Sequence, residues 1–161
     1  MSMIRINNEL INEVSSQARQ SPRLRKNFNF HKEASATMQR MLNAMEPNTY
    51  IQPHKHENPD KTEVFFSLRG RLAVVTFMDD GAIADAVVLN PETGSFGVEV
   101  PPRTWHMIVS FDEGAVSYEV KDGPYDVAVD KCFAKWAPAE GDAKCIEYLE
   151  AIKKHIERLL G

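Results

Sequence analysis

Residues 48–70 read NTYIQPHKHENPDKTEVFFSLRG, and this stretch sets the expectations for the rest of the chain. His54 and His56 are two residues apart, so their side chains share one face if YIQPHKH is extended. Glu63 opens the β-prone run EVFFSL after the loop-like segment ENPDKT, and it can face back toward the histidines from a paired strand. Imidazole is the commonest biological ligand of mid-row transition metals, and a carboxylate adds an oxygen donor. The spacing therefore predicts a metal site.

A fourth ligand candidate, His106, begins another β-prone run after the prolines of VPPRTW. Three nitrogens and one oxygen are compatible with Fe, Mn, Ni, Co, Cu or Zn, so the residues predict one divalent transition metal ion without identifying it. Four protein ligands on a six-coordinate ion would leave two positions for water or substrate, as in a catalytic site. The alternative is that His54 and His56 are ordinary barrel-mouth residues hydrogen-bonded to Glu63.

Size and composition favour one domain, because 161 residues suffice for a single full core. A formal net charge of -4 gives no electrostatic reason to expect nucleic acid or an anionic membrane as partner. No apolar run is long enough to span a bilayer, and the N-terminus lacks the apolar core of a secretory signal. The two cysteines, Cys132 and Cys145, are too few for a disulfide framework, which favours the cytoplasm and leaves their redox state open.

Helical periodicity occurs at both ends of the chain. Residues 7–20 form an amphipathic pattern that Asn7 or Asn8 can cap and that Ser21-Pro22 ends. Residues 142–160 form another, with Asp142 as its N-cap candidate. The apolar stripe of this second pattern consists of Ile146, Leu149, Ile152, Ile156 and Leu159.

The residues between the two helices have the texture of a β protein, with short runs of Val, Ile, Phe and Thr between turn residues. Strands are expected near 37–45, 48–55, 62–69, 71–79, 82–89, 96–100, 105–111, 115–121 and 125–130. Many short strands without intervening helices favour a sandwich or barrel. We expect a helix and arm over 1–34, with Arg23, Arg25 and Lys26 in a solvated turn, a β-barrel over 35–130, and a C-terminal segment and helix over 131–161.

The metal-site residues resemble the first motif of the cupin superfamily, which has the form G-x5-HxH-x3-4-E-x6-G. His54, His56, Glu63 and Gly70 match this motif. Asn48 takes the place of the leading glycine, and six residues instead of three or four separate the second histidine from the glutamate. The resemblance implies a mainly β fold, the cupin double-stranded β-helix or jelly-roll barrel, here with an N-terminal and a C-terminal helix.

The second cupin motif, G-x5-PxG-x2-H-x3-N, is matched more loosely. Pro101 and His106 fit, while Arg103 stands where glycine is expected and Ser110 where asparagine is expected. The resemblance implies that one metal ion is held by His54, His56, Glu63 and His106. Because cupin barrels often pair through sheet edges, it also implies a homodimer.

Three further segments, SPRLRKNFNFH, QRMLNAMEPNTYIQPHKH and FAKWAPAEGD, are similar to the WbuC-type cupin metalloproteins. Bacteria often encode these proteins beside genes for O-antigen and other surface polysaccharides. The resemblance implies a role in sugar or polysaccharide biosynthesis, in which the metal would act as a Lewis acid on a small molecule, as in an isomerase or epimerase. The alternatives are an iron-dependent oxygenase and a non-catalytic ligand-binding or sensor protein. No residue is identified as catalytic.

Several polar residues are candidates for substrate binding. Arg103 precedes His106 and offers a two-pronged donor for a carboxylate or phosphate, although it could equally form a surface salt bridge. The other candidates are Tyr50, Arg40, Asn43, Asn29 and His31. Tyr50 shares strand parity with His54, and Arg40 and Asn43 lie on the expected strand before the motif. Asn29 and His31 are two residues apart, so both can face one side.

Overall fold

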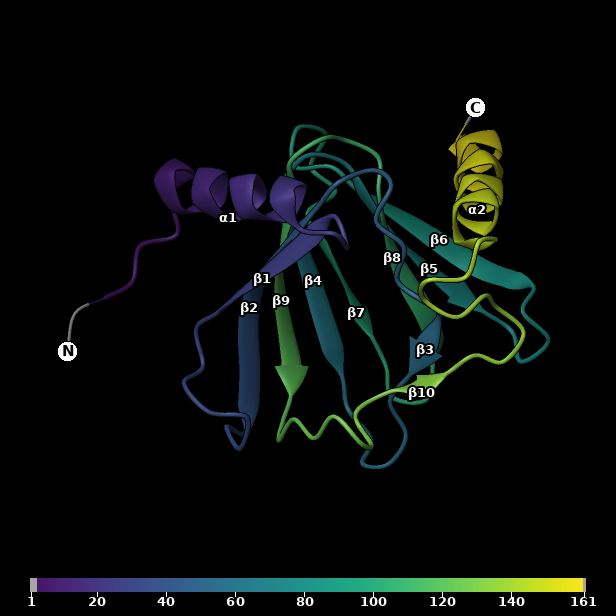
Figure 1. Cartoon of the computed structure of the whole chain (residues 1–161), viewed down its shortest axis with the longest axis horizontal. Helices are drawn as coiled ribbons and strands as arrows, with labels where there is room; N and C mark the ends of the chain where they lie inside the picture. Colours follow the sequence, from purple (N-terminus) through teal and green to yellow (C-terminus); the bar gives the residue numbers. More distant parts are fainter. Residues whose placement is uncertain (1–2, 161) are drawn as a thin grey trace.

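The computed structural model describes residues 3–160 and consists of two five-stranded antiparallel sheets with a helix near each end (Figure 1). The elements are α1 (Asn8–Gln20), β1 (Arg25–Asn29), β2 (Met38–Met45), β3 (His54–Lys55), β4 (Glu63–Arg69), β5 (Leu72–Phe77), β6 (Ile83–Leu89), β7 (Gly97–Val100), β8 (Trp105–Ser110), β9 (Ala115–Asp122), β10 (Cys132–Phe133) and α2 (Cys145–Leu160). Residues 1, 2 and 161 of the expected domain lie outside the described residues, as does the Leu160 side chain. One sheet has the order β1-β2-β9-β4-β7, and the other has the order β10-β3-β8-β5-β6. This architecture confirms the expected cupin jelly roll with its two helices.

Helix α1 covers the outer face of the first sheet, on the left in Figure 1. Asn7 caps it as expected, because its side-chain oxygen accepts a hydrogen bond from the Leu10 N–H at 3.1 Å. The chain leaves the helix at Ser21, whose backbone is extended before Pro22. The buried residues that join the helix to the sheet are Ile11, Val14, Ala18, Leu42, Ala44 and Val116.

Helix α2 packs against the outer face of the second sheet and begins three residues later than the pattern suggested. Asp142 accepts a hydrogen bond from the Lys144 N–H at 2.8 Å, so it caps the turn before the helix. Ile146 and Leu159 of the expected stripe are 49% and 63% exposed, and the other three members are buried. Neither described helix combines the length and the apolar character needed to cross a membrane.

The space between the sheets is apolar at one end and polar at the other. The apolar end is filled by Met45, Ile51, Phe65, Leu72, Val74, Leu89, Val100, Ile108 and Ala115. Alternate residues of a strand share one face, so Glu63 on β4, His106 on β8 and Lys121 on β9 point to the same inner side of the barrel as these apolar residues. The register thus gathers the inward polar side chains where β4 and β8 begin and β9 ends.

Two expectations for the strands are wrong. The solvated turn expected at Arg25 and Lys26 is the start of β1, which pairs along its whole length with β2. Its polar composition suits an edge strand, because alternate residues of such a strand meet solvent or a cleft. The strand expected over 125–130 is a turn. The Asp126 side chain accepts a hydrogen bond from the Ala128 N–H at 2.9 Å, and the Asp126 backbone carbonyl accepts one from the Asp130 N–H at 2.7 Å.

The expected strand over 48–55 is reduced to two residues, His54 and Lys55. A backbone hydrogen bond from the Thr49 N–H to the Glu46 carbonyl turns the chain at its start. Pro53, which lacks an N–H, limits ladder pairing before β3. Strands β1 and β10 also extend the sheets beyond residues 35–130, the range expected for the barrel.

Candidate metal centre

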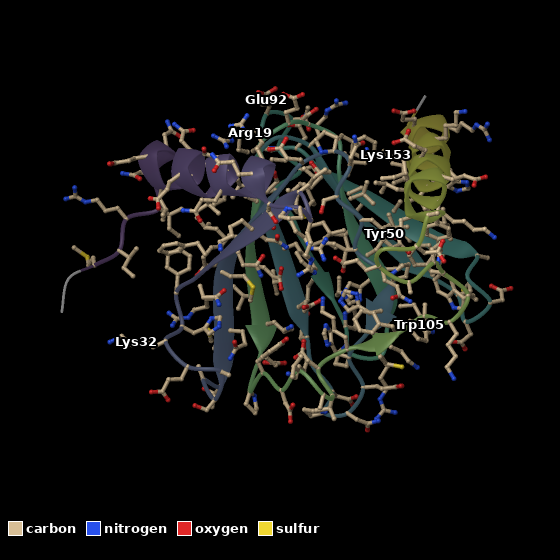
Figure 2. All side chains as sticks on the ribbon, viewed as in Figure 1. Arg19, Lys32, Tyr50, Glu92, Trp105 and Lys153 are labelled. Carbon is tan, nitrogen blue, oxygen red and sulfur yellow. The ribbon has the colours of Figure 1, made fainter. Side chains whose placement is uncertain are left out.

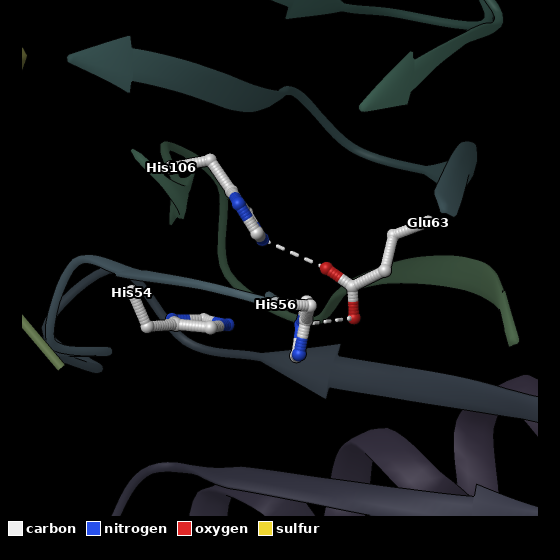
Figure 3. Close-up of side chains that lie close together, drawn as sticks. All are labelled: His54, His56, Glu63 and His106. Carbon is white, nitrogen blue, oxygen red and sulfur yellow. Dashed lines mark hydrogen bonds and ion pairs between the residues drawn. The ribbon is translucent and has the colours of Figure 1, made fainter. Parts of the chain in front are cut away.

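Four buried side chains from both sheets converge on one point in the polar end of the barrel (Figure 3). His54 on β3 lies directly opposite His106 on β8, and His56 follows two residues after His54. Glu63 reaches the same point from the first position of β4 in the other sheet. One ligand atom from each of the four lies within 4.8 Å of all the others, and none of the four residues is more than 4% exposed.

The three imidazole rings are held in the same way, by a backbone carbonyl at Nδ1. His54 Nδ1 lies 3.0 Å from the Gln52 carbonyl oxygen, and His106 Nδ1 lies 2.8 Å from that of Thr104. His56 Nδ1 is hydrogen-bonded to the Asp130 carbonyl oxygen. When each Nδ1–H donates to its carbonyl, each Nε2 keeps its lone pair, which is the tautomer of a metal-bound histidine.

The Nε2 atoms crowd against the Glu63 carboxylate. His106 Nε2 lies 2.7 Å from Glu63 Oε2, and His56 Nε2 lies 3.2 Å from Glu63 Oε1. His56 Nε2 nevertheless has no hydrogen-bond partner within the described part of the chain, although it is buried. A buried polar atom without a partner costs about 1–3 kcal/mol, and a cation between the lone pairs would remove that cost. Three imidazole nitrogens and one carboxylate oxygen fit a mid-row divalent transition metal.

Behind the four residues lies a buried ion-pair network centred on Asp130. Its two side-chain oxygens accept hydrogen bonds from Lys61 Nζ at 2.6 Å and Lys121 Nζ at 2.8 Å. Lys121 Nζ also lies 3.5 Å from Glu63 Oε1. Burial acts to raise the pKa of Asp130, but the two lysine hydrogen bonds outweigh it and lower that pKa. Similarly, the neighbouring side chains of His106 and His56 outweigh burial and lower the pKa of Glu63. Both carboxylates are therefore ionised at neutral pH.

A cleft of about 760 Å³ lies between the inward faces of β1, β2 and β9 and the segment around β10. It reaches the metal centre near His54, because Gln52 and Phe133 line it and both contact that histidine. The Phe133 and His54 ring centroids are 6.1 Å apart. A small molecule in the cleft would thus lie next to the cluster.

Three of the six substrate-binding candidates line the cleft, and three do not. Asn29, Asn43 and His31 line the cleft. His31 Nδ1 also accepts a hydrogen bond from the Arg40 N–H at 3.0 Å, which ties the arm to β2. The Arg40 side chain lies on the opposite face of β2, on the side of α1, because strand residues alternate.

The other two candidates lie away from the cleft lining. The Tyr50 hydroxyl donates to the Pro138 carbonyl at 2.7 Å, and its ring belongs to the core beneath α2 (Figure 2). Arg103 donates through Nε to the exposed carboxylate of Asp60 at 2.8 Å, which is the surface salt bridge considered for it. Its φ of 62° lies in the left-handed region, and its N–H donates to the His56 carbonyl at 2.9 Å. The turn before His106 thus takes up the backbone conformation that favours glycine although arginine occupies it.

Sequence reasoning missed five charged residues around the cluster, namely Lys61, Glu119, Lys121, Asp130 and Lys131. The alternation in AVSYEVKD placed Glu119 and Lys121 on one face of β9 and could have identified them. Asp130 and Lys61 lie outside the strands, and no periodicity marks them. Burial, followed by the charge of Glu63, raises the pKa of Glu119, whose side chain accepts from Asn43 Nδ2 at 3.3 Å.

Comparisons with known proteins connect this geometry to a family and a fold. No curated protein sequence matches the chain. A family model described as "Domain of unknown function (DUF6016)" matches residues 6–89, more than half of the 161 residues. Among solved structures, KdgF from Halomonas sp. is 13% identical with a TM-score of 0.50, and the match covers 66% of this chain and 84% of KdgF.

Two larger proteins also resemble the chain in part. The capsular polysaccharide assembling protein CapF from Staphylococcus aureus is 17% identical with a TM-score of 0.52, over 68% of this chain and 28% of CapF. An oxalate oxidase in complex with the substrate analogue glycolate is 13% identical with a TM-score of 0.52, over 70% of this chain and 56% of the oxidase. The chain therefore spans less than two thirds of these two proteins. At such identities the similarity shows the fold alone.

Proposed function

The chain belongs to the DUF6016 family, and we propose that it is a metal-binding protein of the cupin fold that acts on, or binds, a small molecule. The observation that carries this proposal is the cluster of His54, His56, Glu63 and His106. Backbone carbonyls turn each ring so that Nε2 faces the cluster, and one of these buried atoms lacks a hydrogen-bond partner among the residues that the structure describes. Such an arrangement is costly unless a cation shares it.

A divalent metal held there would supply Lewis acidity to a carbonyl or hydroxyl oxygen of the substrate. Within the protein, Glu119 is the carboxyl that we assign to proton transfer. It lines the cleft, it is buried, and burial followed by the charge of Glu63 raises its pKa, which is the direction that an acid–base group needs. The Asn43 hydrogen bond orients this carboxyl. An isomerisation or epimerisation needs this combination of a polarised oxygen and a nearby acid–base group.

A role in sugar or surface-polysaccharide biosynthesis is the finer part of the proposal. It rests on the resemblance of three segments to the WbuC-type cupins, and the description of CapF as a capsular polysaccharide assembling protein agrees with it. Side-chain amides in the cleft, including Asn29, Asn43 and Gln52, suit the hydroxyl groups of such a substrate.

An iron-dependent oxygenase is the second candidate, favoured by the likeness to oxalate oxidase. Oxygen consumption by the iron(II)-loaded protein across thiols, organic acids and sugars discriminates between the two, because an epimerase consumes none. Tight retention of a ligand without turnover would instead support the sensor function.

Metal content tests the proposal directly. The protein is purified without a histidine tag, and bound metals are measured by elemental analysis for wild type, His54→Ala, His56→Ala and Glu63→Gln. We expect about one metal ion per wild-type chain. Each variant removes one ligand, so its affinity for the metal should fall at least 10-fold and its metal content should fall with it. His155→Ala, an exposed histidine on α2, is the matched control and should keep the wild-type content. Unchanged metal content in all three site variants would refute the proposal.

The homodimer implied by the cupin resemblance belongs to the same proposal. Exposed apolar residues on the outer face of the first sheet, Phe66 and Leu68 on β4, give it a surface on which to form. Light scattering at rising protein concentration should give twice the monomer mass, and a constant monomer mass would exclude the dimer. The free thiols of Cys132 and Cys145 suit a reducing compartment such as the cytoplasm.

A further inference from the structure

Cationic side chains outnumber anionic ones along the cleft. The basic residues in its lining are Arg23, Arg25, Lys26, Lys32, Lys121 and Lys131, whereas the acidic ones are Glu33, Glu119 and Glu140. Glu140 is bound by two of the arginines at 2.6 and 2.7 Å, so it offsets only part of their charge. The lining of the cleft as a whole therefore carries an excess of positive charge.

Lys131 is the partly buried cation of the cleft that this arrangement leaves without a direct partner among the described residues. Its neighbour Asp130 has both oxygens occupied, one by Lys61 and the other by Lys121. Glu63 is taken up by the histidines. Within residues 3–160, the Lys131 ammonium forms no hydrogen bond or ion pair, although it lines the cleft and burial lowers its pKa. Lys131 is half-buried, and Glu63, Glu119 and Asp130 attract its charge from a distance, but no described carboxylate forms a direct ion pair with it.

A second observation independently points to a ligand. Asn43 is 5% exposed, lines the cleft, and has a side-chain oxygen without a hydrogen-bond partner within the described range. Its amide nitrogen donates to Glu119, so the free oxygen is an acceptor for a donor that residues 3–160 do not provide. A hydroxyl group is such a donor.

We propose that the cleft binds a small polyhydroxylated anion, with a carboxylate or phosphate oxygen on the Lys131 ammonium and a hydroxyl group donating to Asn43 Oδ1. The inference deepens the proposed function, since it takes the same cleft as the substrate site, and it names the substrate class as hydroxy acids or sugar phosphates. A divalent ion in the centre would add positive charge beside Lys131 and strengthen the attraction.

Isothermal titration of the metal-loaded protein tests the proposal with three matched probes, namely gluconate, glucose 1-phosphate and glucose. We expect at least one of the two anions to bind at least 10-fold more tightly than neutral glucose, and the better of the two identifies the acid group. Lys131→Met should weaken the binding of that anion about 10-fold or more, because a charge-assisted hydrogen bond is lost. Lys131→Arg keeps the charge and should retain most of the affinity. Lys154→Met, an exposed lysine on α2, removes the same charge far from the cleft and should bind as wild type does.

Asn43→Leu separates the two contacts. The substitution should weaken the binding of the polyhydroxylated anion several-fold. It should leave the binding of inorganic phosphate unchanged, because phosphate needs only the Lys131 ammonium. Equal affinity for glucose and both anions, or wild-type affinity in Lys131→Met, would overturn the inference. These outcomes are independent of the metal-content test, in which the proposed function fails only if the histidine and glutamate variants keep their metal.

Discussion

At the scale of single residues, the site depends on side chains that do not face the metal centre. Asp130 fixes His56 through its backbone carbonyl and binds Lys61 and Lys121 through its carboxylate. All three charged groups are buried, so each relies on the others for compensation. The pair of lysines thereby connects the loop before β4 to the end of β9.

Asp130→Asn should destabilise the protein by about 3–5 kcal/mol, because it leaves the buried Lys61 without a counter-ion and Lys121 with only the more distant Glu63. Urea denaturation at neutral pH measures the free energy of unfolding. Asp112→Asn is the matched control, since Asp112 pairs with Arg71 at 2.7 Å on the surface and should cost less than about 1 kcal/mol. Equal losses in the two variants would show that the Asp130 network contributes no more than a surface pair.

Residue-level prediction succeeded where strand parity sufficed and stopped where loops decide the geometry. His54 and His56 share a face, as two residues of one extended segment must. The residues of the Asp130 network come from separate segments, and nothing in their local sequence indicates that they meet. Arg103 illustrates another limit, because a positive φ at arginine is visible only in the folded chain.

At the scale of elements, α2 is held to the barrel through two tyrosines. Tyr50 and Tyr148 meet edge to face, with ring centroids 6.1 Å apart, and the Tyr50 hydroxyl donates to the Pro138 carbonyl. Burial raises the pKa of Tyr50 above its usual value of 10.0, and burial raises that of Tyr148 to about 12. Both side chains must therefore stay neutral for α2 to pack.

The stability of the protein should consequently fall as pH rises from about 10 to 12. In that window the unfolded chain loses the tyrosine protons while the folded chain keeps them, so rising pH favours unfolding. Tyr50→Phe should lower the free energy of unfolding by about 1 kcal/mol at pH 8, because the variant lacks one hydrogen bond. Above pH 10 its free energy of unfolding should fall less steeply with pH than that of the wild type. Urea denaturation at pH 8, 10 and 11 measures both effects, with Tyr125→Phe, at an exposed position, as control. An identical alkaline slope in Tyr50→Phe and wild type would contradict this assignment.

Elements with a strong internal period were predictable, and elements defined by their partners were not. Both helices were visible as apolar stripes, since a helix forms its hydrogen bonds within its own segment. The start of strand β1 was expected to be a solvated turn because Arg25 and Lys26 are charged, and only pairing with β2 makes it a strand. Strand β10 has two residues, too few for any alternation to be read.

At the scale of the whole molecule, the metal centre joins the two sheets. His54 and His106 belong to the sheet that α2 covers, whereas Glu63 belongs to the sheet that α1 covers. Apolar packing holds the sheets together at the other end of the barrel. At the polar end, the contacts between sheets are hydrogen bonds and ion pairs, which contribute less unless a cation completes them.

A metal ion in this centre would therefore stabilise the fold as well as supply chemistry. Binding to the folded state alone adds about 2.7 kcal/mol when free metal is 100-fold above the dissociation constant. For a chain of this size, that corresponds to a rise in Tm of about 5–10 °C. Thermal unfolding of the metal-loaded protein, with and without excess chelator, measures the difference. His56→Ala should abolish the difference, because it removes one ligand, and His155→Ala should preserve it. A chelator-dependent shift of the same size in His56→Ala would mean that the metal stabilises the protein from another site.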